Sequence, residues 1–129
     1  MKLFSLLALV GFFGLQSAIC QIYVDISATG LDNGTSWTNA YTNLQDAITD
    51  ATGTPGADDI YIAEGTYLPT ATLDRDISFE IPANTNVYGG FSPTNGAIDL
   101  GTRDSTIYPT ILSGDIGVPG TTTDNSDTV

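Results

Sequence analysis

Short apolar runs of strand length alternate with polar, turn-rich stretches along most of the chain. Three of these runs stand out, and each carries Gly or Asp at or near its end: residues 59–65, 86–91 and 109–115. They are rich in β-branched and aromatic residues, which is typical of strands. No helical pattern separates them, and few two-residue Asn-Gly or Asp-Gly turns, the strongest hairpin signal, join them. The pattern therefore predicts a mainly β domain built by parallel winding.

Two further segments are predicted to be strands. Residues 22–25 form the first, and residues 77–81 alternate apolar with polar side chains, so the second is expected to bury one face. Residues 64–67 are predicted to turn. The spacing of the strand centres is irregular and fits a coil of a repeat protein or, nearly as well, a β-sandwich.

One segment has helical periodicity. Apolar residues recur at three- and four-residue steps from Trp37 to Ala51. We predict a helix over about residues 42–51, with the Thr42 side chain accepting from the backbone of Gln45 in a capping box. Glycine and proline follow the helix and end it.

The N-terminus is typical of a secretory signal peptide. Lys2 supplies positive charge, and residues 3–15 are almost wholly apolar but shorter than the roughly 20 residues that a membrane span needs. Small residues follow, with Ala18 three positions before the predicted cut between Cys20 and Gln21. We expect residues 1–20 to be removed and residues 21–129 to form one domain, with no membrane span left in the mature chain.

The single cysteine has two possible fates. Ordinary cleavage removes Cys20 and leaves a mature chain without thiol chemistry. In a lipoprotein signal, Cys20 would instead become the acylated first residue. Ile19 argues against that alternative, because a small residue is favoured at that position.

The charge balance narrows the classes of function. Fifteen acidic residues face three basic ones, for a formal net charge of −12. Such a chain repels phosphate backbones and anionic membranes, so nucleic acid is not expected as a partner. The sequence contains no histidine, which removes Ser-His-Asp and Cys-His catalysis and the usual zinc sites. No catalytic constellation is predicted, and the chain is not expected to be an enzyme.

Acidic and amide side chains offer a few candidate metal sites. Asp58 and Asp59 precede a strand and are predicted to form a solvated turn rather than a calcium site, since calcium needs six to eight oxygens from a shaped loop. Asp115, Asp124 and Asn125 form the most oxygen-rich set. Calcium is a candidate ligand there, against the simpler interpretation that these side chains cap turns.

Other candidates are charged or aromatic. Asp74 and Asp76 flank Arg75, which is expected to pair with them on a loop. Arg103 is expected to anchor the long loop before the last strand. A set of aromatic residues is a candidate platform for stacking sugars, although strand aromatics more often pack within the sheet. Its members are Tyr61, Tyr67, Tyr88, Phe91 and Tyr108.

An ordered set of motifs resembles a known architecture. The sequence is similar to the opening segment of secreted bacterial right-handed parallel β-helix proteins of the pectin-lyase-like superfamily, as in large surface proteins of Bacteroidetes and polymorphic outer-membrane proteins. The matching stretches are YVDISATGLDNGTSWTNAYTNLQDAI, DDIYIAEGTYLPT, SFEI, NVYGGF, TRDSTIYPTILSGDI and the DN of residues 124–125.

The resemblance implies a layout. The helical segment with Trp37 and Leu44 would cap the N-terminal end of the β-helix, and family members continue for many coils, so residues 21–129 would be the capped but incomplete beginning. The inward-facing stacks would come from strand residues. These are Ile60, Ile62, Phe79, Ile81, Val87, Ile111 and Leu112.

The resemblance also frames the function. The fold hosts lyases, esterases, adhesins and passenger domains alike. We expect a non-catalytic portion of a secreted or cell-surface protein, with a structural, adhesive or carbohydrate-contacting role. The expected partners are polysaccharide or cell-surface components and further coils of the same protein. The alternatives are a fragment of a polysaccharide lyase or esterase, and a β-sandwich carbohydrate-binding module.

Overall fold

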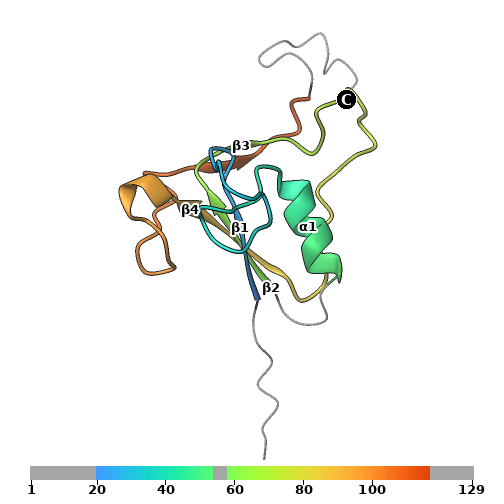
Figure 1. Ribbon diagram of the computed structural model, residues 1–129. Coiled ribbons are helices and arrows are strands. Elements are labelled where there is room, and N and C mark those ends of the chain that lie inside the picture. Colours follow the sequence, from blue (N-terminus) through green and yellow to red (C-terminus); the bar gives the residue numbers. More distant parts are fainter. Residues whose placement is uncertain (1–19, 54–57, 117–129) are drawn as a thin grey trace, which may run out of the picture.

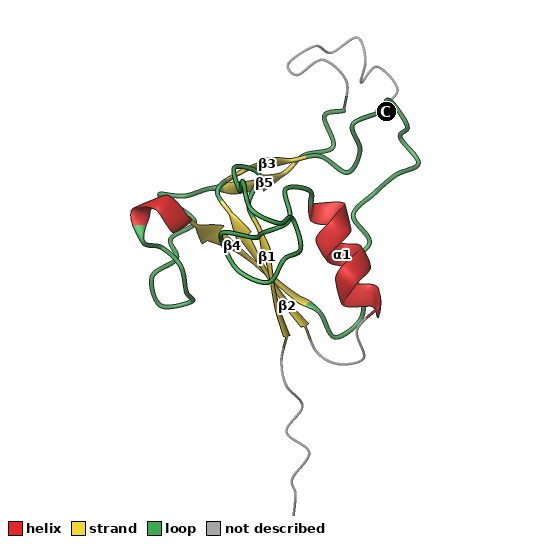
Figure 2. Cartoon of the chain, in the orientation of Figure 1, coloured by secondary structure: helices red, strands yellow, loops and turns green. Residues whose placement is uncertain are grey.

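The computed structural model describes residues 20–53 and 58–116, a small domain that is mostly strands with few helices (Figure 1). Its elements follow in the order β1 (Cys20–Val24), α1 (Leu44–Gly53), β2 (Asp58–Ala63), β3 (Gly65–Tyr67), β4 (Asn86–Phe91), the 3₁₀ helix η1 (Pro93–Asn95) and β5 (Thr110–Leu112). Figure 2 shows α1 on one side of the strands and η1 on the other.

The strands form two parallel sheets. One has the order β1-β2-β4, and the other pairs β3 with β5. Every pairing between these strands is parallel, which confirms that the strands pair in parallel and not through hairpins. Only Glu64 separates β2 from β3, so the chain turns from the first sheet into the second at one residue. The backbone nitrogens of Glu64 and Gly65 donate to the carbonyls of Phe91 and Pro109, which tie this corner to the start and the end of the later loop.

The core lies between α1 and the first sheet. Burial of these apolar side chains is the main favourable term that holds the helix in place. The cluster consists of Ile22, Val24, Leu44, Ala47, Ile48, Ala51, Ile60, Ile62 and Tyr67.

The predicted helix is present but begins two residues later than expected. Its cap is Asn43, whose side-chain oxygen accepts from the backbone of Gln45 at 2.9 Å. The predicted capping box is wrong, because both Thr42 donors are directed to Asp32 instead. The Gln45 amide donates to the carbonyls of Pro69 and Ser78 and so holds the following irregular segment against the helix.

Two segments differ from the secondary structure predicted for them. Residues 77–81 are irregular, because they pair with no strand of the described chain. Phe79 packs against the core, while Ile77 and Ile81 are 39% and 40% exposed. The segment predicted as a turn at residues 64–67 contains β3, which gains its partner from β5. That partner is distant in sequence, so local turn chemistry did not reveal the strand.

The predicted inward stacks are only partly correct. Ile60 and Ile62 are fully buried, and Val87 and Phe79 are partly buried against the core. Ile81, Ile111 and Leu112 are 40%, 50% and 45% exposed. Ile111 and Leu112 belong to an outermost strand, with no further layer of described residues over them.

Candidate functional site

The outer edge of β1 is covered by the chain's own backbone. The Tyr23 nitrogen donates to the Gly34 carbonyl at 3.0 Å, and Tyr23 accepts from the Tyr41 nitrogen at 2.9 Å. The Asp25 nitrogen donates to the Tyr41 carbonyl at 2.9 Å. Gly34 makes this possible: its φ is +70°, and a Cβ there would lie 2.5 Å from the Tyr41 ring. The side-chain oxygen of Asn33 holds the same turn by accepting from Thr35.

The opposite edge is covered only in part. Arg103 donates to the Gly89 carbonyl at 2.6 Å, and the Asp104 nitrogen donates to Gly90 at 2.8 Å. These bonds confirm that Arg103 anchors its loop. They cover the end of β4, while residues 86–88 of β4 have a strand neighbour only on the β2 side within the described chain.

The register of the first sheet repeats one pattern of side chains. Gln21, Asp59 and Asn86 share one level; Ile22, Ile60 and Val87 share the next; Tyr23, Tyr61 and Tyr88 share the third. Each strand thus carries a polar residue, a β-branched residue and a tyrosine in succession. The three tyrosines form a column, with centroids 5.9 and 5.6 Å apart in edge-to-face geometry.

The tyrosine column is part of a larger aromatic cluster on the face away from α1. Trp37 lies 4.9 Å from the Tyr23 ring and 5.3 Å from Phe91, and Phe91 stacks on Tyr61 at 4.8 Å. The guanidinium of Arg103 lies 5.7 Å over the remaining ring, Tyr88. Trp37 therefore lies outside the helix and packs on the outer face, which corrects its predicted place in the helical cap.

The residues of the predicted aromatic platform do not lie together. Tyr61, Tyr88 and Phe91 belong to the cluster, but Tyr67 points into the core, and Tyr108 makes none of the ring contacts found in the described chain. Tyr61 and Phe91 are buried, so they pack against their neighbours and offer no open ring face.

Sequence reasoning missed two members of the aromatic cluster. Tyr23 and Trp37 were not among the predicted platform residues. The repeated polar, β-branched, tyrosine triplet was the signal that would have identified Tyr23.

A hollow of about 370 Å³ adjoins Trp37. Its wall combines the indole with hydroxyl side chains and one carboxylate, that of the nearly buried Asp25. Asp25 accepts from the Ser27 backbone and hydroxyl through Oδ1, at 2.8 and 2.6 Å. The indole N–H donates to the Ile98 carbonyl at 3.0 Å, which fixes the ring. The lining residues are Asp25, Ser27, Ala28, Thr29, Trp37, Thr38, Pro93, Thr94 and Ile98.

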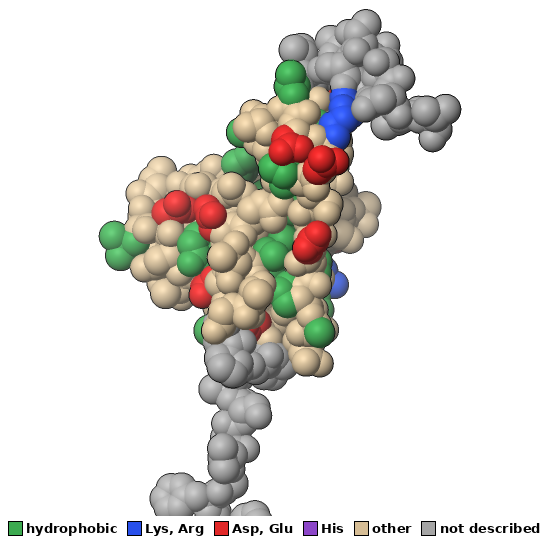
Figure 3. Space-filling view, turned by 90° about the vertical axis from the view of Figure 1, so that its right-hand side faces the viewer, with side chains coloured by type: hydrophobic (Ala, Val, Ile, Leu, Met, Phe, Trp, Pro, Cys, Tyr) green, Lys and Arg blue, Asp and Glu red, His purple; other side chains and the backbone are tan. Residues whose placement is uncertain are grey.

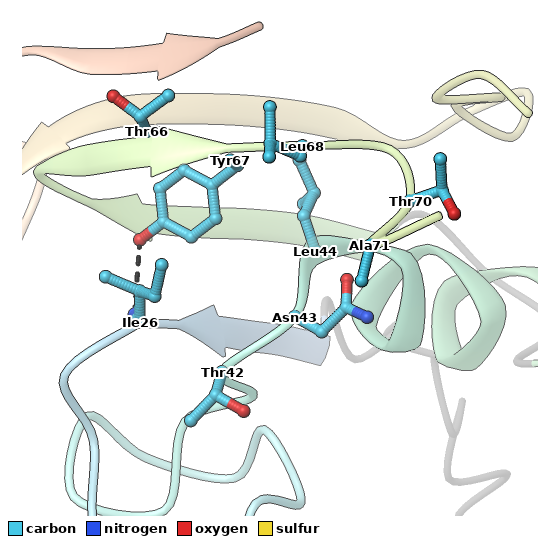
Figure 4. Close-up of a pocket in the computed structure, with 9 residues that line it drawn as sticks. All are labelled: Ile26, Thr42, Asn43, Leu44, Thr66, Tyr67, Leu68, Thr70 and Ala71. Carbon is cyan, nitrogen blue, oxygen red and sulfur yellow. Dashed lines mark hydrogen bonds between the residues drawn. The ribbon is translucent and has the colours of Figure 1, made fainter. Parts of the chain in front are cut away.

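A smaller pocket of about 210 Å³ lies at the beginning of α1 (Figure 4). The Tyr67 ring forms one wall, and its hydroxyl donates to the Ala63 carbonyl at 3.2 Å and accepts from the Ile26 nitrogen at 3.4 Å. Burial raises the pKa of Tyr67 to about 12. This hydroxyl therefore stays protonated at neutral pH and serves the structure as a hydrogen-bond donor.

Asp58 contradicts the solvated turn predicted for it. The residue begins β2 and is only 1% exposed, and its Oδ2 accepts no hydrogen bond from the residues that the structure describes. Burial raises the pKa of this carboxyl, with further contributions from the negative charges of Asp50 and Asp59. Asp59 accepts from the Asn86 amide at 2.9 Å.

The remaining predicted residues are dispersed. Asp115 is partly buried near β5, and its nitrogen donates to the Ser113 hydroxyl; Asp124 and Asn125 lie outside the described residues. Within the described chain, no three metal-ligating side chains gather into a metal site. Cys20 and Gln21 begin β1 and are exposed.

The charged loop at residues 74–76 is also exposed. The Asp76 nitrogen donates to Asp74 at 3.0 Å. Figure 3 shows acidic side chains spread over one face of the molecule, with few basic ones.

Comparisons with family models, with curated proteins and with solved structures gave no match. Among the described residues, no helix has the length and apolar character to cross a membrane.

Proposed function

We propose that this chain forms the capped beginning of a right-handed parallel β-helix and has a structural role in a secreted or surface-attached bacterial protein. The order of the strands supports this. Along the chain, β2 is followed by β3, and β4 by β5; β2 pairs with β4 in one sheet, and β3 pairs with β5 in the other. A one-residue corner between β2 and β3 fits a chain that winds from one wall of a coil to the next.

The difference between the two edges is the observation that carries the proposal. A stacked coil needs a cover at its first edge and an accessible second edge on which the next coil rests. Residues 33–41 cover β1, while residues 86–88 of β4 and the side chains of Ile111 and Leu112 remain uncovered in the described chain.

Amide hydrogen exchange tests this arrangement. The Tyr23 and Asp25 amides donate to the covering loop, so we expect them to exchange slowly. The Val87 amide, which faces away from β2, should exchange much faster. Equal protection at both edges would contradict an accessible second edge and hence the proposed role.

The proposal includes no catalysis by this segment. An assay with pectate, alginate and chondroitin in the presence of calcium should yield no unsaturated product. Product formation that disappears in an Arg75→Ala variant would support instead the alternative of a polysaccharide lyase fragment. Arg75 lines a hollow with Phe79 and Leu112, so its replacement changes a defined surface.

The Trp37 hollow favours a second candidate role, contact with a neutral carbohydrate. Sugar rings combine an apolar face with hydroxyl groups, which an indole and a hydroxyl-lined wall complement. The Asp25 carboxylate accepts hydrogen bonds from sugar hydroxyls but repels uronic acids. Trp37 is the only tryptophan of the chain, so its fluorescence reports on this hollow directly.

Titration with neutral oligosaccharides should change the fluorescence of Trp37, and polygalacturonate should not. A Thr38→Val variant removes one hydroxyl of the wall and should weaken the response, while Thr106→Val, away from the hollow, should preserve it. No response to any neutral oligosaccharide would eliminate this candidate.

A further inference from the structure

The open edge of β4 has the same side-chain pattern that joins the three strands of the first sheet. Asn86, Val87 and Tyr88 repeat the polar, β-branched and tyrosine residues that pair between β1 and β2. Because side chains alternate between the two faces of a strand, this pattern fixes both the register and the face of a neighbour.

Each level of the pattern makes a distinct contact. At the polar level, the Asn86 amide donates to Asp59. At the middle level, Ile22 and Ile60 are buried in the core, and Val87 packs against it. At the tyrosine level, adjacent rings meet edge to face across each strand pair.

Tyr61 and Tyr88 differ in the number of tyrosines beside them. Tyr61 has a tyrosine on both sides and is buried. Tyr88 has a tyrosine on one side only, has the Arg103 guanidinium 5.7 Å over its ring, and is only partly buried. Val87 is likewise less buried than Ile60. The pattern is thus incomplete at β4.

We propose that the outer edge of β4 binds one parallel strand whose sequence is a polar residue, then valine or isoleucine, then tyrosine. This inference rests on the proposed function and specifies the partner that the open edge accepts. The pairing extends over residues 86–88, because the Arg103 loop already occupies the Gly89 and Gly90 carbonyls.

A second copy of this chain fits the edge less well. Its β1 has the right pattern, but the outer edge of that strand is occupied by residues 33–41. Pairing of two β4 strands around a two-fold axis would be antiparallel. With Val87 opposite its counterpart, Tyr88 would face Asn86, and the tyrosine column would end.

Two peptides of identical composition test the proposal. The matched peptide is acetyl-Thr-Asn-Val-Tyr-Thr-Lys-amide, and in the control peptide Val and Tyr are exchanged, which moves each to the opposite face. At millimolar concentration, the matched peptide should slow exchange of the outward-facing Val87 amide by about fivefold. The control peptide should leave the exchange of this amide unchanged.

Variants separate the tyrosine contact from general strand pairing. Tyr88→Ala should abolish the preference for the matched peptide, while Tyr108→Ala, outside the aromatic cluster, should retain it. Equal protection by both peptides would overturn the sequence preference and leave the proposed function standing. Protection by neither peptide would overturn the inference. So would the same degree of protection in a sample without peptide at a higher protein concentration. The proposed function itself is decided by exchange without peptide.

Discussion

The two edges of the first sheet, at β1 and at β4, are covered to different extents. At β1, the backbone of residues 33–41 donates hydrogen bonds to the strand and accepts them from it. At β4, the Arg103 loop reaches only the last part of the strand, and the neighbouring β5 leaves Ile111 half exposed. Unpaired strand edges are templates for further pairing. The same domain therefore protects one edge and leaves the other accessible.

The difference has a local cause. Residues 33–41 closely follow β1 in sequence, so the loop that covers it closes at low entropic cost. The left-handed turn at Gly34 and the helix cap at Asn43 hold both ends of this segment. The cover of β1 is thus built from local interactions, and α1 continues it over the core.

The largest effect on stability is expected from a charge placed in the core between α1 and the first sheet. Leu44 is fully buried between α1 and the first sheet. Leu44→Asp should lower the free energy of unfolding by about 4 kcal/mol, because it removes apolar burial and adds an unpaired charge. Thermal or urea unfolding measures the change. Leu31→Asp, at an exposed position, is the control, and an unchanged melting temperature for Leu44→Asp would contradict the role of the helix.

Opening the cover of β1 should have an intermediate effect. A Cβ at Gly34 meets the Tyr41 ring and requires an unfavourable φ, so Gly34→Ala should destabilise the domain by about 2 kcal/mol. The Tyr23 and Asp25 amides should also exchange faster. Gly114→Ala is the matched control, since a Cβ there meets nothing within 4 Å. If both variants exchange alike, the covering loop does not protect β1.

The sequence predicted the elements whose signals are local. The apolar periodicity located α1, and β-branched runs located β1, β2 and β4. Alternation at residues 77–81 was misleading, since strand formation also needs a partner, and none is present among the described residues. β3 was missed for the opposite reason: its three residues become a strand only because β5 pairs with them.

The candidate site was less predictable. Its central feature is a register between strands, and register depends on contacts between residues far apart in sequence. The aromatic residues at Tyr61 and Tyr88 were recognised, but their alignment with Tyr23 required the pairing itself. The burial of Asp58 was unexpected because acidic pairs at the beginning of a strand usually face solvent, whereas this carboxyl is buried at the beginning of the central strand.

Asp58 offers a test at the strand between the two edges. Its raised pKa means that the native state favours the protonated carboxyl. This contribution to stability is fully present below the ordinary pKa of 3.8 and is lost as pH rises through the raised pKa. Asp58→Asn should therefore stabilise the domain by about 1 kcal/mol at neutral pH, with a smaller gain at acidic pH.

Unfolding measured across the pH range checks this expectation. Asp59→Asn is the control, because Asp59 is partly exposed and accepts from Asn86. A stabilisation of Asp58→Asn that grows as the pH falls would contradict the expected direction of the pH dependence.

The smallest effect on stability is expected at the open edge, where a substitution should instead change association. Ile111 is half exposed on β5, so Ile111→Lys should change the free energy of unfolding by less than about 0.5 kcal/mol. Exposed apolar side chains on an outermost strand promote weak self-association, and a lysine there opposes it. Sedimentation velocity over a range of concentrations should show less association for Ile111→Lys than for the parent chain. Leu31→Lys adds the same charge near the covered edge and should leave association unchanged, so equal reductions by the two variants would indicate a general charge effect and would remove the distinction between the edges.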